Sequence, residues 1–166
     1  MSGQMVLHGV SLSKAEVVSM VVGQLIDELI MRSNRDSEYR HYYDIAIVGY
    51  SGDRVYSLIG DELKFYPITI LAGQDVPRTT YIFSYSTFAN DGTLFQEEVS
   101  LWVRANAQGA TPMYKMICRI TSLVADWCSR EENRDSFPPL VFNVTDGEAS
   151  DASYDMLRSA ARNLRS

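Results

Sequence analysis

Two short apolar runs constrain the fold of this chain more than any other feature. The first is Ile45 to Val48 in "YYDIAIVGYSG", and the second is Leu140 to Val144 in "PPLVFNVTDG". Each run ends directly in turn-forming residues. A strand that is apolar at consecutive positions buries both of its faces, which is typical of a sheet covered by helices on both sides. The two runs therefore predict two buried strands.

Helical segments separate and flank these runs. Residues 11–33, 111–131 and 151–165 are predicted helices, and the first two also carry a start signal. Ser13 and Glu16 have the spacing of a capping box. Thr111 suits an N-cap and Pro112 the first helical position. The apolar stripe of the first helix comprises Val18, Val21, Val22, Leu25, Ile26 and Leu29.

Two hairpins are also predicted. Residues 51–53, Ser-Gly-Asp, make a tight turn that leads into "RVYSLIG" as an antiparallel neighbour. Residues 74–103 are β-rich, and Asn90-Asp91-Gly92 lies between two strand-like segments. The second hairpin is best explained as an insertion.

The alternation of helices with buried strands favours an α/β fold. We expect a three-layer, doubly wound, Rossmann-like sheet, mostly parallel with one antiparallel edge strand, and a β-hairpin-rich insertion around residues 74–103. Residues 1–166 contain no repeat or linker, so they form a single domain.

Charge and composition exclude several classes of function. The net charge of −6 without a basic stripe argues against nucleic-acid binding. No apolar run reaches the roughly 18 residues of a membrane helix, and the N-terminus lacks the pattern of a signal peptide. Cys118 and Cys128 lie about 15 Å apart on one predicted helix. This distance is too long for a disulfide. We therefore interpret both as reduced core residues of a cytoplasmic protein.

A candidate metal site follows from the predicted sheet. Ligands bind at the carboxyl ends of strands in such folds, where Asp146 follows the second apolar run. Thr111, which follows a glycine-bearing loop, could share that edge. Carboxylate and hydroxyl oxygens suit Mg²⁺. The alternative is that Thr111 is an ordinary N-cap and Asp146-Gly147 an ordinary turn.

The order of these segments resembles the von Willebrand factor A (vWA) domain family. The resemblance rests on "DIAIVGYSG", "RVYSL", "GATPM" at 109–113 and "TDGEASD" at 145–151, and covers almost the whole chain. It is nearest to bacterial intracellular members similar to tellurite-resistance-associated proteins. It implies a non-catalytic protein-protein interaction module. Thr111 and Asp146 would be metal ligands of a Mg²⁺-dependent adhesion site (MIDAS) that binds an acidic side chain of a partner.

One part of the family's metal site is missing. The family carries an Asp-x-Ser-x-Ser loop after its first strand, whereas here Gly9 stands in place of the aspartate before Ser11-Leu12-Ser13. Since "MSGQM" resembles the sequence directly after that loop, we expect the domain to be truncated at its N-terminus, and by the same comparison at its C-terminus. Mg²⁺ binding should then be weak or absent. Ser150 and Asp151 would contact the ligand Asp146 without binding the metal themselves. The exposed edge of the incomplete sheet should make the chain self-associate.

Two other interpretations stay open. One is a degenerate, metal-free scaffold domain, which Gly9 favours. The other is a metal-dependent hydrolase of doubly wound fold that uses Asp146, although such enzymes place an aspartate after their first strand. No catalytic motif supports an enzyme, and His8 and His41 lie in polar surroundings typical of the surface.

Overall fold

The computed structural model describes residues 4–7, 10–73, 79–86, 94–104, 109–145 and 147–165, with backbone only at 4–7, 10–12, 79–86 and 94–100. The strands are β1 (Gln4–Leu7), β2 (Val10–Ser13), β3 (Asn34–Arg35), β4 (Glu38–Tyr39), β5 (Asp44–Ile45), β6 (Val48–Ser51), β7 (Arg54–Ser57), β8 (Tyr66–Pro67), β9 (Thr79–Ser86) and β10 (Leu94–Leu101). The helices are α1 (Lys14–Ser33), α2 (Ile68–Ala72), α3 (Met113–Ser129), the 3₁₀ turn η1 (Glu131–Asn133) and α4 (Tyr154–Leu164).

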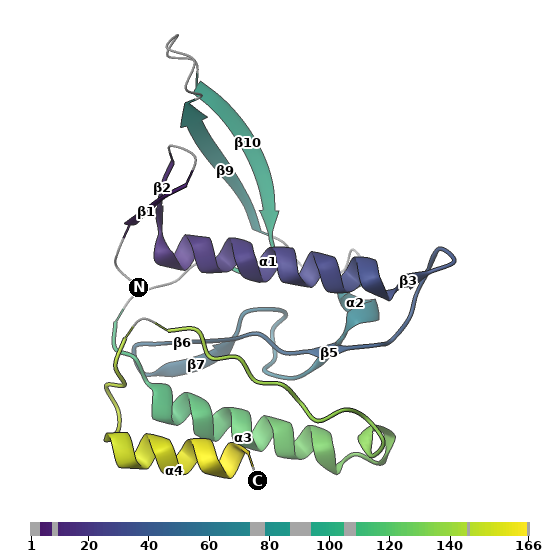
Figure 1. Ribbon diagram of the computed structural model, residues 1–166, viewed down its shortest axis with the longest axis vertical. Coiled ribbons are helices and arrows are strands. Elements are labelled where there is room, and N and C mark those ends of the chain that lie inside the picture. Colours follow the sequence, from purple (N-terminus) through teal and green to yellow (C-terminus); the bar gives the residue numbers. More distant parts are fainter. Residues whose placement is uncertain are drawn as a thin grey trace.

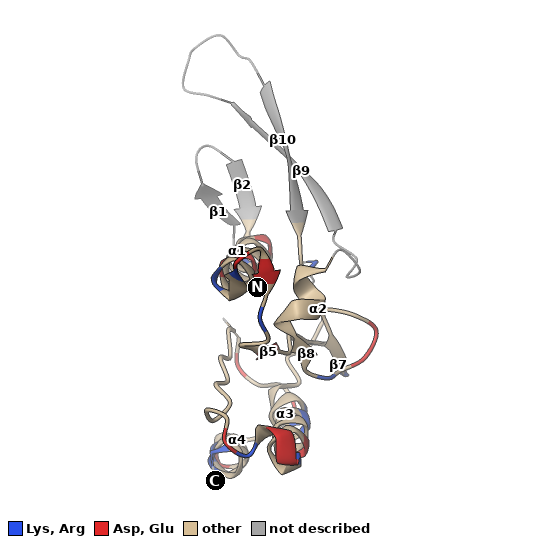
Figure 2. Ribbon diagram, turned by 90° about the vertical axis from the view of Figure 1, so that its right-hand side faces the viewer, with Lys and Arg blue, Asp and Glu red and all other residues tan. Residues whose placement is uncertain are grey.

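The short strands β5 to β8 lie between helices. Figure 1 shows α1 on one side of β5, β6 and β7, and the neighbouring helices α3 and α4, which run in the same direction, on the other side. Figure 2 shows the same order from the side, with α2 next to α1 and with α4 against α3. The helices thus flank strands from both sides, as expected, but the strands between them do not form one sheet.

Helix α1 begins as predicted. The Ser13 hydroxyl accepts a hydrogen bond from the Glu16 N–H, and the Glu16 carboxylate accepts one from the Ser13 N–H, so the capping box is confirmed. The predicted apolar stripe is only partly right. Ile26 is buried, but Val21 and Leu25 are 57% and 54% exposed.

Both predicted hairpins have antiparallel strands. β6 pairs with β7, and Ser51 lies opposite Arg54 across a turn in which Gly52 has a φ of +63°. β9 pairs with β10 from Thr79 opposite Leu101 to Ser86 opposite Leu94. The predicted turn residues Asn90-Asp91-Gly92 lie outside the described residues.

The predicted doubly wound, mostly parallel sheet is wrong. The described strands form five two-stranded sheets, and every pair is antiparallel. The apolar run at 140–144, predicted to be a buried strand, forms no strand, and Leu140 and Phe142 are 82% and 81% exposed. Without a neighbouring strand to accept its backbone hydrogen bonds, this segment joins no sheet. A Rossmann-like vWA sheet is therefore not the architecture of this chain.

The main core lies beneath α1. Its buried side chains come from α1, α2, the loop after β7 and the residues just after β10. They are Ile26, Ile30, Ile59, Ile68, Leu71, Trp102 and Val103. Trp102 is fixed by a hydrogen bond from its indole N–H to the Asp27 carboxylate at 2.8 Å. This bond joins the residues after β10 to α1.

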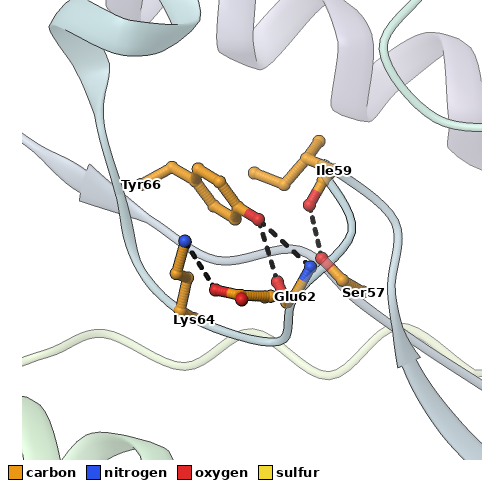
Figure 3. A network of polar contacts seen from close by, with 5 residues as sticks. All are labelled: Ser57, Ile59, Glu62, Lys64 and Tyr66. Atoms are coloured by element: carbon orange, nitrogen blue, oxygen red, sulfur yellow. Dashed lines mark hydrogen bonds and ion pairs between the residues drawn. The ribbon is translucent and has the colours of Figure 1, made fainter. Parts of the chain in front are cut away.

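The loop between β7 and β8 is closed by its own side chains. The Tyr66 hydroxyl donates to the Glu62 carbonyl and accepts from the Glu62 N–H, and the Lys64 ammonium pairs with the Glu62 carboxylate at 2.6 Å (Figure 3). Gly60, within this loop, has a φ of +64°. A Cβ at Gly60 would collide with the Tyr66 hydroxyl, and together with the positive φ this collision favours glycine at this position.

Candidate functional site

Three loops from distant parts of the sequence meet at one end of the strands. We call residues 51–54, 109–113, 145 and 147–151 the loop rim. The Gly52 N–H donates to the Ala110 carbonyl at 2.9 Å. Gly109 has a φ of +85°, and a Cβ there would lie 3.0 Å from the Gly52 Cα. Glycine is thus needed where the first two loops touch.

Thr111 joins the second loop to the third. Its N–H donates to the Ser150 hydroxyl at 2.9 Å, and its carbonyl accepts the Ser150 N–H at 3.0 Å. Its own hydroxyl faces the third loop, since a Cβ at Gly147 would lie 3.3 Å from the Thr111 Oγ1. The structure therefore brings the "GATPM" and "TDGEASD" segments together, as the sequence predicted.

The start of α3 is capped from the third loop and not by its own segment. Asp151 accepts the Tyr114 N–H on one carboxylate oxygen at 3.0 Å and the Lys115 N–H on the other at 2.9 Å. The predicted cap at Thr111 is wrong, because α3 begins at Met113 after Pro112 and Asp151 takes the capping role. Ser150 and Asp151 thus hold the rim together.

The described residues do not by themselves make a magnesium site. Of the two predicted ligands, Asp146 lies outside the described residues. The oxygens of Ser150 and Asp151 already accept backbone N–H groups, and the Thr111 hydroxyl faces the third loop. Mg²⁺ requires near-octahedral oxygen coordination. In addition, no group of three acidic, histidine or cysteine side chains within the described part of the chain is placed to share an ion.

A basic hollow adjoins the rim. It has a volume of about 750 Å³ and lies between β7 and α3. It is lined by Arg54, Val55, Tyr56, Lys115, Cys118, Arg119 and Ser122. The Lys115 ammonium donates to the Asp53 carbonyl of the rim at 2.5 Å, so one lining residue is fixed to the rim at both its backbone and its side chain.

The hollow is unusual for a chain of net charge −6 because three cations line it and no carboxylate does. Neither Arg54 nor Arg119 forms an ion pair with any other residue that the structure describes. This cluster was not predicted from the sequence. The signal was present in the spacing of Lys115 and Arg119, since residues four apart on a helix lie on one face.

Other predicted residues lie away from the rim. His41 pairs with Asp44 at 2.6 Å, and Asp44 also accepts the indole N–H of Trp127 at 3.0 Å. His8 lies outside the described residues. Cys118 and Cys128 are free thiols on one helix, as predicted, but both are exposed, so their interpretation as core residues is wrong.

The hydroxyl of Tyr114, whose backbone N–H is bound by Asp151, has a shifted pKa. A hydrogen bond with the Cys118 thiol raises the pKa of the Tyr114 hydroxyl, and the nearby charges of Cys118 and Asp151 add to the rise. The shift keeps the Tyr114 hydroxyl protonated to a higher pH than that of an ordinary tyrosine.

Comparisons with known proteins found no match to a protein-family model, to a curated protein or to a solved structure. Among the helices that the structure describes, none combines the length and apolar character needed to cross a membrane.

Proposed function

We propose that this chain is a non-catalytic protein-protein interaction module that binds an acidic segment of a partner. The observation that carries the proposal is the basic hollow, in which Arg54, Lys115 and Arg119 line one concave surface without a carboxylate. Guanidinium groups form paired hydrogen bonds with carboxylates, so two arginines and a lysine suit clustered acidic side chains.

The loop rim supports this proposal by fixing one wall of the hollow. Lys115 is held through its N–H by Asp151 and through its ammonium by the Asp53 carbonyl. Arg54 directly follows the rim turn as the first residue of β7. A cation that is already ordered loses less entropy when a partner binds, which favours recognition.

This mode of binding needs no metal. The resemblance to vWA domains implies a Mg²⁺ ion between the module and the partner's carboxylate, whereas the basic hollow offers permanent positive charge for the same group. The two modes differ in which residue matters. Direct binding depends on Arg54 and Arg119, and metal-bridged binding depends on Thr111 and Asp146.

The test is a binding titration with an acidic peptide. A fluorescent peptide of alternating Asp and Ser would be titrated with the wild type, with Arg54→Glu/Arg119→Glu, and with the matched variant Arg158→Glu/Arg162→Glu on α4. We expect saturable binding by the wild type and by the α4 variant, and at least about tenfold weaker binding by the hollow variant, since it reverses two contacting charges.

Further arms separate the two modes. Binding that persists in EDTA and in Thr111→Val supports direct recognition. Equal affinity of the hollow and α4 variants would contradict the proposal, as would binding that requires added Mg²⁺.

A further inference from the structure

The cations of the basic hollow gather at the end next to the loop rim. Arg54 is the first residue of β7, and Lys115 lies in the first turn of α3. Both elements start at the rim, where the Lys115 ammonium donates to the Asp53 carbonyl. Arg119 follows Lys115 by four residues, which is about 6 Å along the helix axis. Three positively charged residues therefore lie near one end of the hollow.

The other side chains of the hollow are apolar or weakly polar. They are Val55, Tyr56, Cys118 and Ser122. Ser122 lies farthest along α3, seven residues after Lys115 and on the same helix face. Its hydroxyl already donates to the Cys118 carbonyl at 3.3 Å, and the Tyr56 hydroxyl is hydrogen-bonded to the Ser51 hydroxyl at 3.2 Å. The hollow thus offers concentrated positive charge at one end and surfaces without fixed charge beyond it.

The cations are better matched by one phosphate than by one carboxylate. Neither Arg54 nor Arg119 forms an ion pair with another residue that the structure describes. A carboxylate carries one charge and accepts the paired donors of a single guanidinium. A phosphate monoester carries nearly two charges at pH 7 and has three acceptor oxygens. One phosphate can therefore be shared by two guanidinium groups and an ammonium group.

We propose that the basic hollow binds a phosphorylated serine or threonine of the partner segment, an inference that rests on the proposed function. Its volume of about 750 Å³ exceeds the size of one phosphate and lies within the range of about 300–1,000 Å³ that is usual for ligand pockets. Residues beside the phosphate on the partner therefore have room against Val55 and Tyr56. A nucleic-acid backbone is a poorer match, because its charges repeat along a strand, whereas this positive charge is confined to one hollow of a chain with a net charge of −6.

The test compares two fluorescent peptides of similar charge. One carries a single phosphoserine among neutral residues, and the other carries two adjacent aspartates in its place. We expect the wild type to bind the phosphopeptide at least about tenfold more tightly, because one phosphate reaches all three cations. Equal affinities would overturn this inference and leave the proposed function standing. Failure to bind these two peptides and also the peptide of alternating Asp and Ser would overturn both.

A variant that keeps the charge separates phosphate recognition from simple attraction. Arg119→Lys retains a cation but loses the paired donors of the guanidinium. We expect about tenfold weaker binding of the phosphopeptide and only about a twofold change for the aspartate peptide, so the preference should fall. Arg162→Lys on α4 is the matched control and should keep the preference, with circular dichroism to verify that both variants fold. An unchanged preference in Arg119→Lys would contradict the proposal.

Inorganic phosphate separates the bound group from the peptide that carries it. We expect free phosphate to displace the phosphopeptide only at concentrations at least about a hundredfold above the Kd of the peptide, because it lacks the flanking residues that contact Val55 and Tyr56. Displacement at a concentration close to that Kd would assign the hollow to free phosphate and would overturn the assignment to a partner polypeptide.

Discussion

Thr111 and Ser150 are joined by two hydrogen bonds that run in opposite directions. The Thr111 N–H donates to the Ser150 hydroxyl, and the Ser150 N–H donates to the Thr111 carbonyl. The first bond depends on a side chain and the second does not. The link between two loops 39 residues apart in sequence can therefore be weakened by one substitution without being removed.

We predict that Ser150→Ala lowers the free energy of unfolding by about 1 kcal/mol, the usual net contribution of one hydrogen bond. Ser136→Ala is the matched control, because Ser136 is exposed in another loop and its side chain makes no hydrogen bond to a described residue. Urea unfolding followed by circular dichroism measures both. Equal effects of the two variants would show that the Ser150 hydroxyl does not hold the rim.

Asp151→Ala should have a comparable or larger effect, because Asp151 caps α3 from outside the helix. We expect a loss of about 1 kcal/mol, within the range of about 0.5–2 kcal/mol found for helix caps. Glu148→Ala serves as control, since it removes an exposed carboxylate from the same loop that has no described partner. If helix content and stability of the two variants coincide, the carboxylate of Asp151 is not the cap.

Two glycines with nearly the same backbone conformation should differ in their tolerance of alanine. Gly52 and Gly60 have φ values of +63° and +64°. Gly52→Ala meets no atom within 4 Å, so only the left-handed conformation opposes it, at about 1 kcal/mol. Gly60→Ala also collides with the Tyr66 ring and should cost roughly 1–3 kcal/mol more.

Thermal unfolding of the two glycine variants would measure the difference. Tyr66 is held by hydrogen bonds to Glu62, so its ring resists displacement (Figure 3). Similar melting temperatures for the two variants would mean that the loop between β7 and β8 rearranges freely around Tyr66.

The ion pair in the same loop predicts a pH dependence. The hydrogen bond with Lys64 holds the pKa of the Glu62 carboxyl below its ordinary value, and the same bond raises the pKa of Lys64. A lowered pKa in the folded state stabilises the protein above the pKa of the unfolded state. That stability is lost as the pH falls through the lowered value.

The stability of the wild type should therefore exceed that of Glu62→Gln at pH 7, and the difference should shrink as the pH falls below about 4.5. The effect is small because both side chains are exposed. Melting temperatures at a series of pH values measure it, with Glu148→Gln as control. A difference that grows on acidification would contradict the predicted sign.

The sequence predicted those features that depend on residues close together in the chain. The capping box needs only Ser13 and Glu16, and the turn between β6 and β7 needs only residues 51–54, so both were read correctly. The meeting of the loops around Thr111 and Ser150 was also expected, through the family resemblance.

The features that depend on distant residues were not predictable in the same way. The cap of α3 comes from Asp151, 36 and 37 residues beyond the amides that it binds, so a local pattern assigned it to Thr111. The apolar run at Leu140 to Val144 indicated a buried strand, yet burial requires a neighbouring strand that no local pattern supplies. The basic hollow likewise forms only when β7 and α3 come together.

The segment 137–144 is extended and exposed, as the segments that proteases cleave usually are. Proteases bind extended backbone by pairing with its edges, and Phe137 and Phe142 offer the side chains that enzymes of aromatic specificity prefer. A brief digestion should therefore cut here first and separate α4 from the rest of the chain. Because α4 packs against α3, the two fragments should remain together in solution after the cut.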